Sequence, residues 1–216
     1  MRRTHQLGAL FFAAVALSSH LLAQAPAAQP AADKSNPWEY SLTVDGYIVP
    51  NGTSYASPIF TADNNWHFEA RYNDEDLYTG SLWFGYNFNF GKKKKLKVDL
   101  TPMLGGVMGR TTGIAPGLET TLTYKKIEFY AASEYVFDTT KSSGSFFYSW
   151  PQLTYSPVKW FHIGAVAQHT DAYHTSLNIQ RGFLLGVSYK KLEFTTYVFD
   201  PELANPTTVL EVGYNF

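Results

Sequence analysis

Residues 82–90 have the sequence Leu-Trp-Phe-Gly-Tyr-Asn-Phe-Asn-Phe, in which every even position is large and apolar. Since successive side chains of a β-strand point to opposite faces, this period of two predicts a strand with two unlike faces. The same alternation recurs from Trp38 onward, over 38–48, 66–72 and 127–137 among others. No stretch keeps the three- and four-residue spacing of an amphipathic helix. The sequence therefore predicts an all-β fold.

The connections between the predicted strands alternate between short and long. Short breaks recur roughly every 32 residues, at 62–65, 92–95, 125–126, 158–159 and 190–191, and longer connections rich in Gly, Ser, Asp and Pro lie at 51–54, 73–76, 109–113, 138–145, 170–178 and 200–206. Two short breaks share a motif, Tyr-Lys-Lys-Ile-Glu-Phe at 124–129 and Tyr-Lys-Lys-Leu-Glu-Phe at 189–194. This pattern predicts twelve strands between Trp38 and Phe216.

The strand near 55–61 is the weakest of the twelve, because Pro58 lies within it and proline cannot donate a hydrogen bond to a neighbouring strand. Ten or fourteen strands are the alternatives if this region is organised differently. An even number brings both ends of the chain to the same side of a closed barrel.

Alternating tight turns and longer loops are typical of a transmembrane antiparallel up-and-down β-barrel, with the turns on the periplasmic side and the loops outside. The chain ends on the alternating residues Leu210, Val212, Tyr214 and Phe216. This ending resembles the C-terminal signal of bacterial outer-membrane β-barrel proteins, the class that includes small porin-like barrels. The resemblance implies that the barrel assembly machinery recognises Phe216 and Tyr214, and that outer-membrane lipid and lipopolysaccharide surround the protein. It does not extend to a functional subfamily.

The N-terminal residues have the order of a secretory signal peptide. Arg2 and Arg3 precede an apolar stretch at 7–17, and Ala23-Gln24-Ala25 offers a cleavage site of small residues. We therefore expect a signal peptide over 1–25, cleaved within 23–28, a disordered lead-in over 26–36 and a transmembrane β-barrel domain over 37–216. This arrangement predicts export across the inner membrane and residence in the bacterial outer membrane.

The amino-acid composition excludes several classes of function. The 216 residues include 17 basic and 18 acidic side chains and no cysteine. A net charge of −1 argues against nucleic acid as a partner, and the absence of cysteine excludes disulfides and cysteine-ligated metals. Aromatic residues make up 17% and charged residues 16% of the chain, compared with about 25% charged in average globular proteins.

A soluble barrel with the apolar face inward is the alternative architecture. Strand charges fall on the face opposite the large apolar side chains, which both architectures allow. Twelve apolar faces rich in Phe, Tyr, Leu and Val would overfill the interior of a soluble barrel, whereas a bilayer accommodates them. The transmembrane barrel is therefore preferred.

The polar face predicts the residues that line the lumen. Carboxylates outnumber the basic groups on this face, so we expect an aqueous pore that prefers cations. The alternative is a closed lumen in which the carboxylates pair with Arg71, Lys97 and buried water. The predicted pore-lining residues are Glu39, Asp45, His67, Glu69, Arg71, Lys97, Asp99, Glu119, Glu128, Glu134, His162, Glu193 and Glu211.

Within this set, His67, Glu69 and Arg71 alternate along one strand face. They could form a selectivity site or proton relay, but we favour a salt-bridge ladder that holds the register of neighbouring strands. Glu69 and Glu119 are expected to face water and to tune selectivity. Replacing both with Gln should lower the preference for cations.

No enzyme, cofactor or metal site is predicted. An outer-membrane lipid hydrolase would need a Ser/His pair, for which His162, His169 or His174 with Ser149, Ser176 or Ser188 are the candidates, but no Gly-x-Ser-x-Gly motif is present. The spacing of His169, Asp171 and His174 suits no specific metal geometry. The lysines of the short turns are interpreted as a solvated rim.

The sequence thus predicts a porin-like channel for passive passage of small solutes with a cation bias. The alternative from a different class is a non-conducting structural or surface-interaction barrel. The identity of a solute and the oligomeric state do not follow from the sequence.

Overall fold

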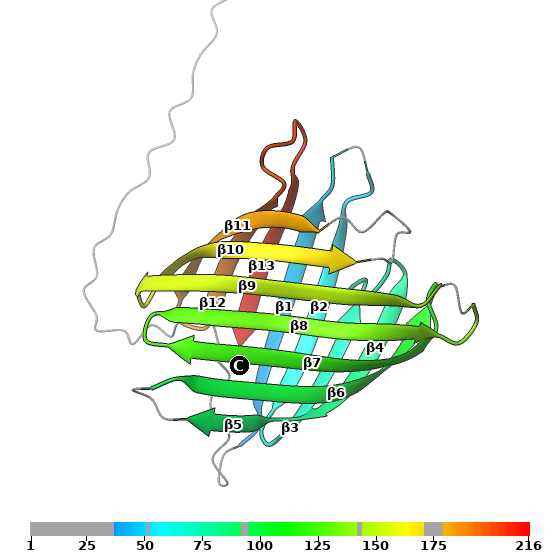
Figure 1. Ribbon diagram of the computed structural model, residues 1–216, viewed down its shortest axis with the longest axis horizontal. Helices are drawn as coiled ribbons and strands as arrows, with labels where there is room; N and C mark the ends of the chain where they lie inside the picture. The colour runs from blue at the N-terminus through cyan, green and yellow to red at the C-terminus, as the bar shows by residue number, and fades with distance from the viewer. Residues whose placement is uncertain (1–36, 51, 92–94, 142–143, 171–178) are drawn as a thin grey trace, which may run out of the picture.

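The computed structural model describes residues 37–50, 52–91, 95–141, 144–170 and 179–216. Its strands form one antiparallel sheet that closes on itself, because β1 pairs with both β2 and β13 and β6 pairs with β4 (Figure 1). The strands are β1 (Glu39–Ile48), β2 (Tyr55–Asp63), β3 (Trp66–Tyr72), β4 (Thr79–Tyr86), β5 (Phe88–Gly91), β6 (Lys97–Gly109), β7 (Gly113–Tyr124), β8 (Ile127–Asp138), β9 (Phe146–Val158), β10 (Phe161–Thr170), β11 (Gln180–Tyr189), β12 (Leu192–Phe199) and β13 (Thr207–Asn215).

The sheet is a twelve-stranded barrel. Strands β4 and β5 are separated by Asn87 alone and both pair with β6, so they form one barrel strand with an interruption. The predicted all-β fold and strand count are confirmed. The described residues contain no helix with the length and apolar character needed to cross a membrane.

Pro58 does not break its strand. It pairs with Val44 of β1, and the pairing of β2 with β3 begins one residue later, at Ile59. Pro58 therefore lies where β2 has a single neighbouring strand, a position at which proline is tolerated. The ten- and fourteen-strand alternatives are excluded.

The two Tyr-Lys-Lys turns adopt the same conformation. Lys125 and Lys190 have φ angles of 58° and 57°, the left-handed value that tight hairpin turns require at their first position. The ammonium groups of the two lysines lie over the rings of Tyr124 and Tyr189, at 5.1 and 5.3 Å from the ring centroids. The sequence repeat therefore corresponds to a structural repeat. Lys92, Lys93 and Lys94 of the remaining lysine-rich turn lie outside the described residues.

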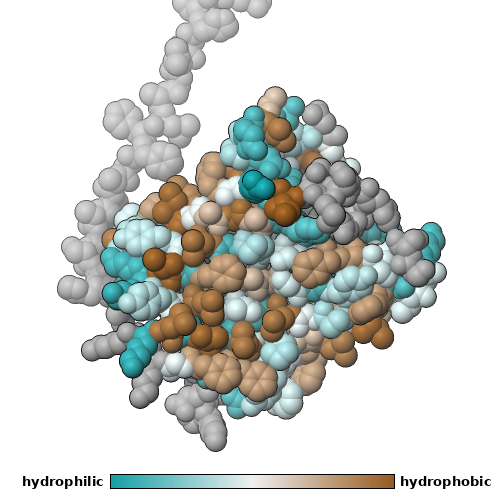
Figure 2. Space-filling model, viewed as in Figure 1, coloured by the Kyte–Doolittle hydropathy of each residue, from teal (hydrophilic) through white to brown (hydrophobic). Residues whose placement is uncertain are grey.

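The outer wall of the barrel is apolar. Leu210, Val212 and Tyr214 of β13 are exposed, as the alternation predicts, and so are the large apolar side chains of the other strands. Figure 2 shows hydrophobic residues spread over the face of the barrel that is turned to the viewer. Buried polar groups, among them Ser57, His67 and Glu119, lie inside. This distribution is the reverse of that in a soluble barrel and argues against the soluble alternative.

The interior is not polar along its full length. Two clusters of buried apolar side chains fill the end of the barrel near the long loops, and Trp150 packs against both. We call these residues the loop-side core: Trp83, Met103, Val107, Ala115, Val136, Phe146, Tyr148, Tyr47, Val166, Leu184, Tyr197, Phe199, Val209 and Trp150. They occupy the same inward-facing register as the predicted lumen residues, so the inner face of the barrel is apolar in one part and polar in another.

Gly105 makes room for the largest side chain of this core. A Cβ atom at position 105 would lie 2.5 Å from the indole of Trp83, well inside van der Waals contact. The indole is only 2% exposed, packed over the backbone of β6. Glycine is therefore required at this point of the barrel wall by close packing.

Candidate functional site

A cavity of about 330 Å³ occupies the end of the barrel near the short turns, and we call it the turn-side cavity. Its walls come from β1 to β3, β7 to β10, β12 and β13, and at its inner limit it meets Tyr47, Tyr148, Trp150 and Tyr197 of the loop-side core. The predicted pore-lining residues that reach it are Glu39, Asp45, His67, Glu69, Arg71, Glu119, Glu128, His162, Glu193 and Glu211.

Three predicted residues are inside the barrel but do not line this cavity. Lys97 and Asp99 form an ion pair in which Nζ and Oδ2 are 2.6 Å apart. Glu134 is buried against Arg71. Alternation places a residue on the inner face, but it does not tell whether that residue meets the cavity or another side chain.

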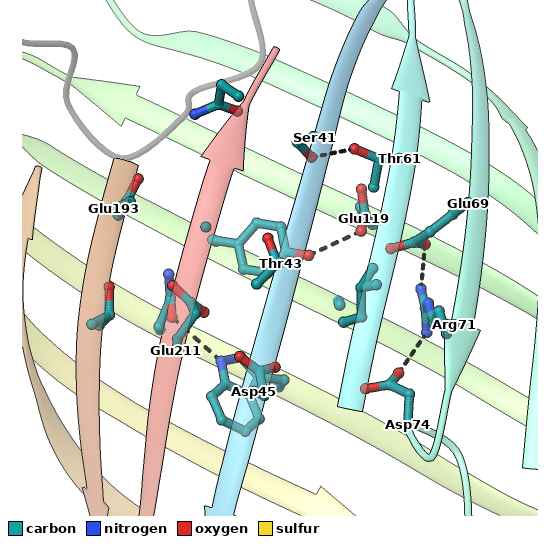
Figure 3. A pocket seen from close by; sticks show the side chains of 18 of the residues that line it. Ser41, Thr43, Asp45, Thr61, Glu69, Arg71, Asp74, Glu119, Glu193 and Glu211 are labelled. Carbon is teal, nitrogen blue, oxygen red and sulfur yellow. Dashed lines mark hydrogen bonds and ion pairs between the residues drawn. The ribbon is translucent and has the colours of Figure 1, made fainter. Parts of the chain in front are cut away.

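Arg71 is the centre of a buried ion-pair network. Its guanidinium lies 2.7 Å from Glu69 Oε2, 3.0 Å from Asp74 Oδ2 and 2.9 Å from Glu134 Oε2. It also lies over the indole of Trp83, 4.6 Å from the ring centroid. Figure 3 shows Glu69, Arg71 and Asp74 joined in one chain.

These contacts support an ion-pair interpretation of the His67, Glu69, Arg71 alternation, with one difference from the predicted ladder. Glu69 lies on the same strand as Arg71, and Glu134 lies on β8, which does not pair with β3. The network therefore ties together distant parts of the wall rather than holding the register of adjacent strands.

The loop between β3 and β4 contributes acidic groups that the sequence did not assign to the interior. Glu75 and Asp76 are 2% and 4% exposed. Glu75 Oε1 accepts hydrogen bonds from Ser81 and from Trp83 Nε1, the latter at 3.0 Å. Asp76 accepts hydrogen bonds from Arg110 and from the hydroxyl of Thr111. The sequence marked 73–76 as a long connection, and nothing in its composition indicates that it folds inward.

Asp74 of this loop is buried between Arg71 and the cavity. Burial raises the pKa of Asp74 to about 6, although the adjacent Arg71 guanidinium acts in the opposite direction. Its Oδ1 atom is 3.5 Å from the hydroxyl of Ser57, which donates to it. The loop carboxyl is therefore held at the boundary between the cavity and the loop-side core.

The remaining cavity carboxyls are partnered mainly by hydroxyl groups. Glu211 accepts a hydrogen bond of 3.0 Å from Tyr197 and lies directly opposite Asp45 in the β1–β13 pairing. Glu193 Oε1 is 3.8 Å from His162 Nε2. Glu128 accepts a hydrogen bond of 3.1 Å from Thr123. Acidic groups thus face one another across the cavity with few cations between them.

His67, Glu69 and Glu119 come together on one side of the cavity. The ligand atoms that these three buried side chains offer all lie within 4.8 Å of one another. His67 Nδ1 is 2.8 Å from Asp63 Oδ1, and Glu119 accepts a hydrogen bond of 2.9 Å from Tyr130. The sequence placed all three on the inner face but did not reveal that β3 and β7 bring them together.

The residues considered for a lipid hydrolase do not form a catalytic pair among the described residues. Ser149 is opposite His169 in the β9–β10 pairing, but its hydroxyl bonds that of Ser133 and no hydrogen bond joins it to His169. His162 bonds Thr195. Asp171, His174 and Ser176 lie outside the described residues.

Comparison with known proteins supports the fold. No protein-family model matches the chain, and no curated protein matches it. Among solved structures, the barrel is similar to the "KdgM porin", with a TM-score of 0.54 and 11% identity over 82% of this chain and 99% of that one. It is also similar to the "KdgM porin in complex with disordered oligogalacturonate", with a TM-score of 0.53 and 9% identity over the same shares. At these identities the likeness establishes the twelve-stranded barrel fold.

Proposed function

We propose that this protein is a porin-like channel of the bacterial outer membrane for passive passage of small solutes. The observation that carries the proposal is the division of the barrel into an apolar outer wall and an interior cavity lined by acidic and hydroxyl groups. The apolar wall suits contact with lipid, and the polar cavity suits hydrated solutes. The fold shared with the KdgM porin supports the same proposal.

The cavity also supports a preference for cations. Glu128, Glu193 and Glu211 lie in its wall, together with Asp45. A ring of carboxylates in a confined aqueous space raises the local concentration of cations and repels anions. Passage of anionic solutes such as the oligogalacturonate of the solved complex is therefore not expected for this chain.

The export route belongs to the same proposal. The signal-peptide segment over 1–25 and the lead-in over 26–36 lie outside the described residues. At the other end, Tyr214 and Phe216 are exposed on the outer wall, and the amide of Phe216 donates to the carbonyl of Tyr40 at 2.9 Å. An exposed terminal aromatic on the strand that closes the barrel suits recognition by the assembly machinery.

The loop-side core favours a second candidate, a barrel that does not conduct. Trp150 bridges the two apolar clusters, and its indole meets the rings of Tyr197 and Phe199 edge-on at 5.2 Å. A solute entering from the loop side has to pass this layer. The channel and the non-conducting barrel differ in whether this layer of aromatic side chains opens to let a solute pass.

Single-channel recording of the refolded mature protein in a planar bilayer under a KCl gradient separates them. The channel proposal predicts discrete steps with a reversal potential on the cation-selective side. The E193Q/E211Q variant should move that potential toward zero, because two acidic side chains are removed from the cavity wall. A silent wild-type protein that has folded correctly would contradict the proposal and support the non-conducting barrel.

The W150A variant tests the role of the loop-side core. Removing the bridging indole should raise the single-channel conductance several-fold, since the ring separates the cavity from the loops. Trp160 is the matched control, because it is 57% exposed in the β9–β10 turn, and W160A should leave the conductance unchanged. An equal change in both variants would show that Trp150 does not limit passage.

A further inference from the structure

Three buried side chains on the wall of the turn-side cavity offer one nitrogen and two carboxylate groups to a common point. They are His67 and Glu69 of β3 and Glu119 of β7, with ligand atoms within 4.8 Å of one another. Strands β3 and β7 do not pair, because β4 and β6 lie between them in the sheet. The curvature of the barrel therefore assembles this group from distant parts of the wall.

The orientation of His67 indicates a ligand. Its Nδ1 atom is 2.8 Å from Asp63 Oδ1, so the proton shared with that carboxylate belongs on Nδ1. Nε2 points at the cluster, 3.6 Å from Glu69 Oε2, and has no hydrogen-bond partner although the side chain is only 1% exposed. A carboxylate that orients an imidazole from behind is the usual outer partner of a histidine metal ligand.

The local charge is also unbalanced. Six carboxyl groups share two basic groups here: Arg71 pairs with Glu69, Asp74, Glu75 and Glu134, His67 pairs with Asp63 and Glu69, and Glu119 lies beside His67 and Glu69. Buried anions are costly unless cations or hydrogen-bond donors compensate them. A bound divalent cation would supply the missing positive charge at the side of the cluster away from Arg71.

We propose that His67, Glu69 and Glu119 bind a divalent transition-metal ion, with Zn²⁺ as the representative. An imidazole nitrogen with two carboxylates is a ligand set that suits zinc and its neighbours better than Mg²⁺ or Ca²⁺, which prefer oxygen ligands alone. Zinc bonds of about 2.1 Å require the three side chains to move slightly closer together. The cavity gives water access to a fourth position. The proposal depends on the barrel fold and not on whether the lumen conducts.

Calorimetric titration of ZnCl₂ into the full-length mature barrel in detergent tests the site. We expect one ion per chain, with binding weakened at least about 100-fold in H67N and in E119Q. The D63N variant retains all three ligands and removes only the partner of Nδ1, so its affinity should fall by about 10- to 100-fold. The H169N/H174N variant is the matched control and should bind as the wild type does.

Heat-modifiability on gels establishes that each variant has folded before it is titrated. Absence of zinc binding in the wild type would overturn the proposal, as would unchanged binding in H67N or loss of binding in H169N/H174N. If H67N and E119Q do not fold, X-ray absorption of zinc-loaded H162N/H169N/H174N decides, because His67 is then the one histidine left after residue 28. A ligand shell around zinc that includes an imidazole supports the site, and a shell of oxygen ligands alone overturns it.

Discussion

The two ends of the barrel interior are built by the same strands and differ in chemistry. The turn-side cavity is lined by carboxyls and hydroxyls, whereas the loop-side core is made of closely packed aromatic and aliphatic side chains. The change occurs within single strands. On β12 the inward-facing positions pass from Glu193 and Thr195 to Tyr197 and Phe199.

This contrast shows that the alternation along a barrel strand fixes which side chains point inward, but not whether those side chains are polar. Where the inward-facing side chains are polar, they leave room for water. Where they are apolar, they close the lumen by the same close packing that forms the core of a soluble protein. Arg71 lies where the two regions meet, with carboxylates on one side and the Trp83 ring on the other. The following substitutions test how independent the two regions are.

The largest effect is expected at the boundary. R71M keeps most of the side-chain volume but removes the guanidinium that contacts Glu69, Asp74 and Glu134, so these buried carboxyls lose that partner. Loss of one member of a buried ion pair costs about 3–5 kcal/mol. Urea unfolding of the refolded barrel, followed by tryptophan fluorescence, measures the change.

Arg181 provides the control for this substitution. It is exposed beside a long loop and shares the outer face with Phe183. R181M should change the free energy of unfolding by no more than about 0.5 kcal/mol. Similar losses in R71M and R181M would show that the buried network does not stabilise the barrel.

An intermediate effect is expected in the loop-side core. G105A places a methyl group 2.5 Å from the Trp83 indole and should destabilise the barrel by about 1–3 kcal/mol through overpacking. Gly106 is the adjacent control, because a Cβ atom there would meet nothing within 4 Å. Equal unfolding midpoints for G105A and G106A would mean that Trp83 is not tightly packed.

The smallest effect, and of opposite sign, is expected in the turn-side cavity. Asp45 and Glu211 are direct partners across β1 and β13, so their carboxyl groups repel each other whenever both are ionised. E211Q retains an acceptor for Tyr197 and should stabilise the barrel by about 0.2–1 kcal/mol. D45N should give a similar gain, and the double variant less than the sum of the two. A loss of stability in E211Q would contradict the repulsion.

Much of the architecture could be predicted from the sequence because the relevant signals are local. Alternation gave the strands, the repeated Tyr-Lys-Lys motif marked two identical turns, and Leu210, Val212 and Tyr214 lie on the outer wall as expected. Most of the predicted lumen residues line the cavity. Each of these inferences needs only the direction in which neighbouring side chains point.

What the sequence did not reveal depends on contacts between residues far apart in the chain. Arg71 meets Glu134 at a separation of 63 residues, and the loop at 73–78 turns inward so that Glu75 meets Trp83. The meeting of His67 with Glu119 follows from the curvature of a closed sheet. A one-dimensional pattern contains no information on which side of the lumen an inward side chain faces.

By itself, therefore, the sequence predicted an antiparallel barrel of twelve strands, its apolar outer wall and most of the charged residues that line its cavity. The tertiary structure alone decided that the loop-side half of the interior is filled, that one arginine collects carboxyls from separate strands, and that three metal-ligating side chains converge. The physical reason is that strand alternation is set by the backbone within a few residues, whereas closure of the sheet fixes which residues share the space inside it.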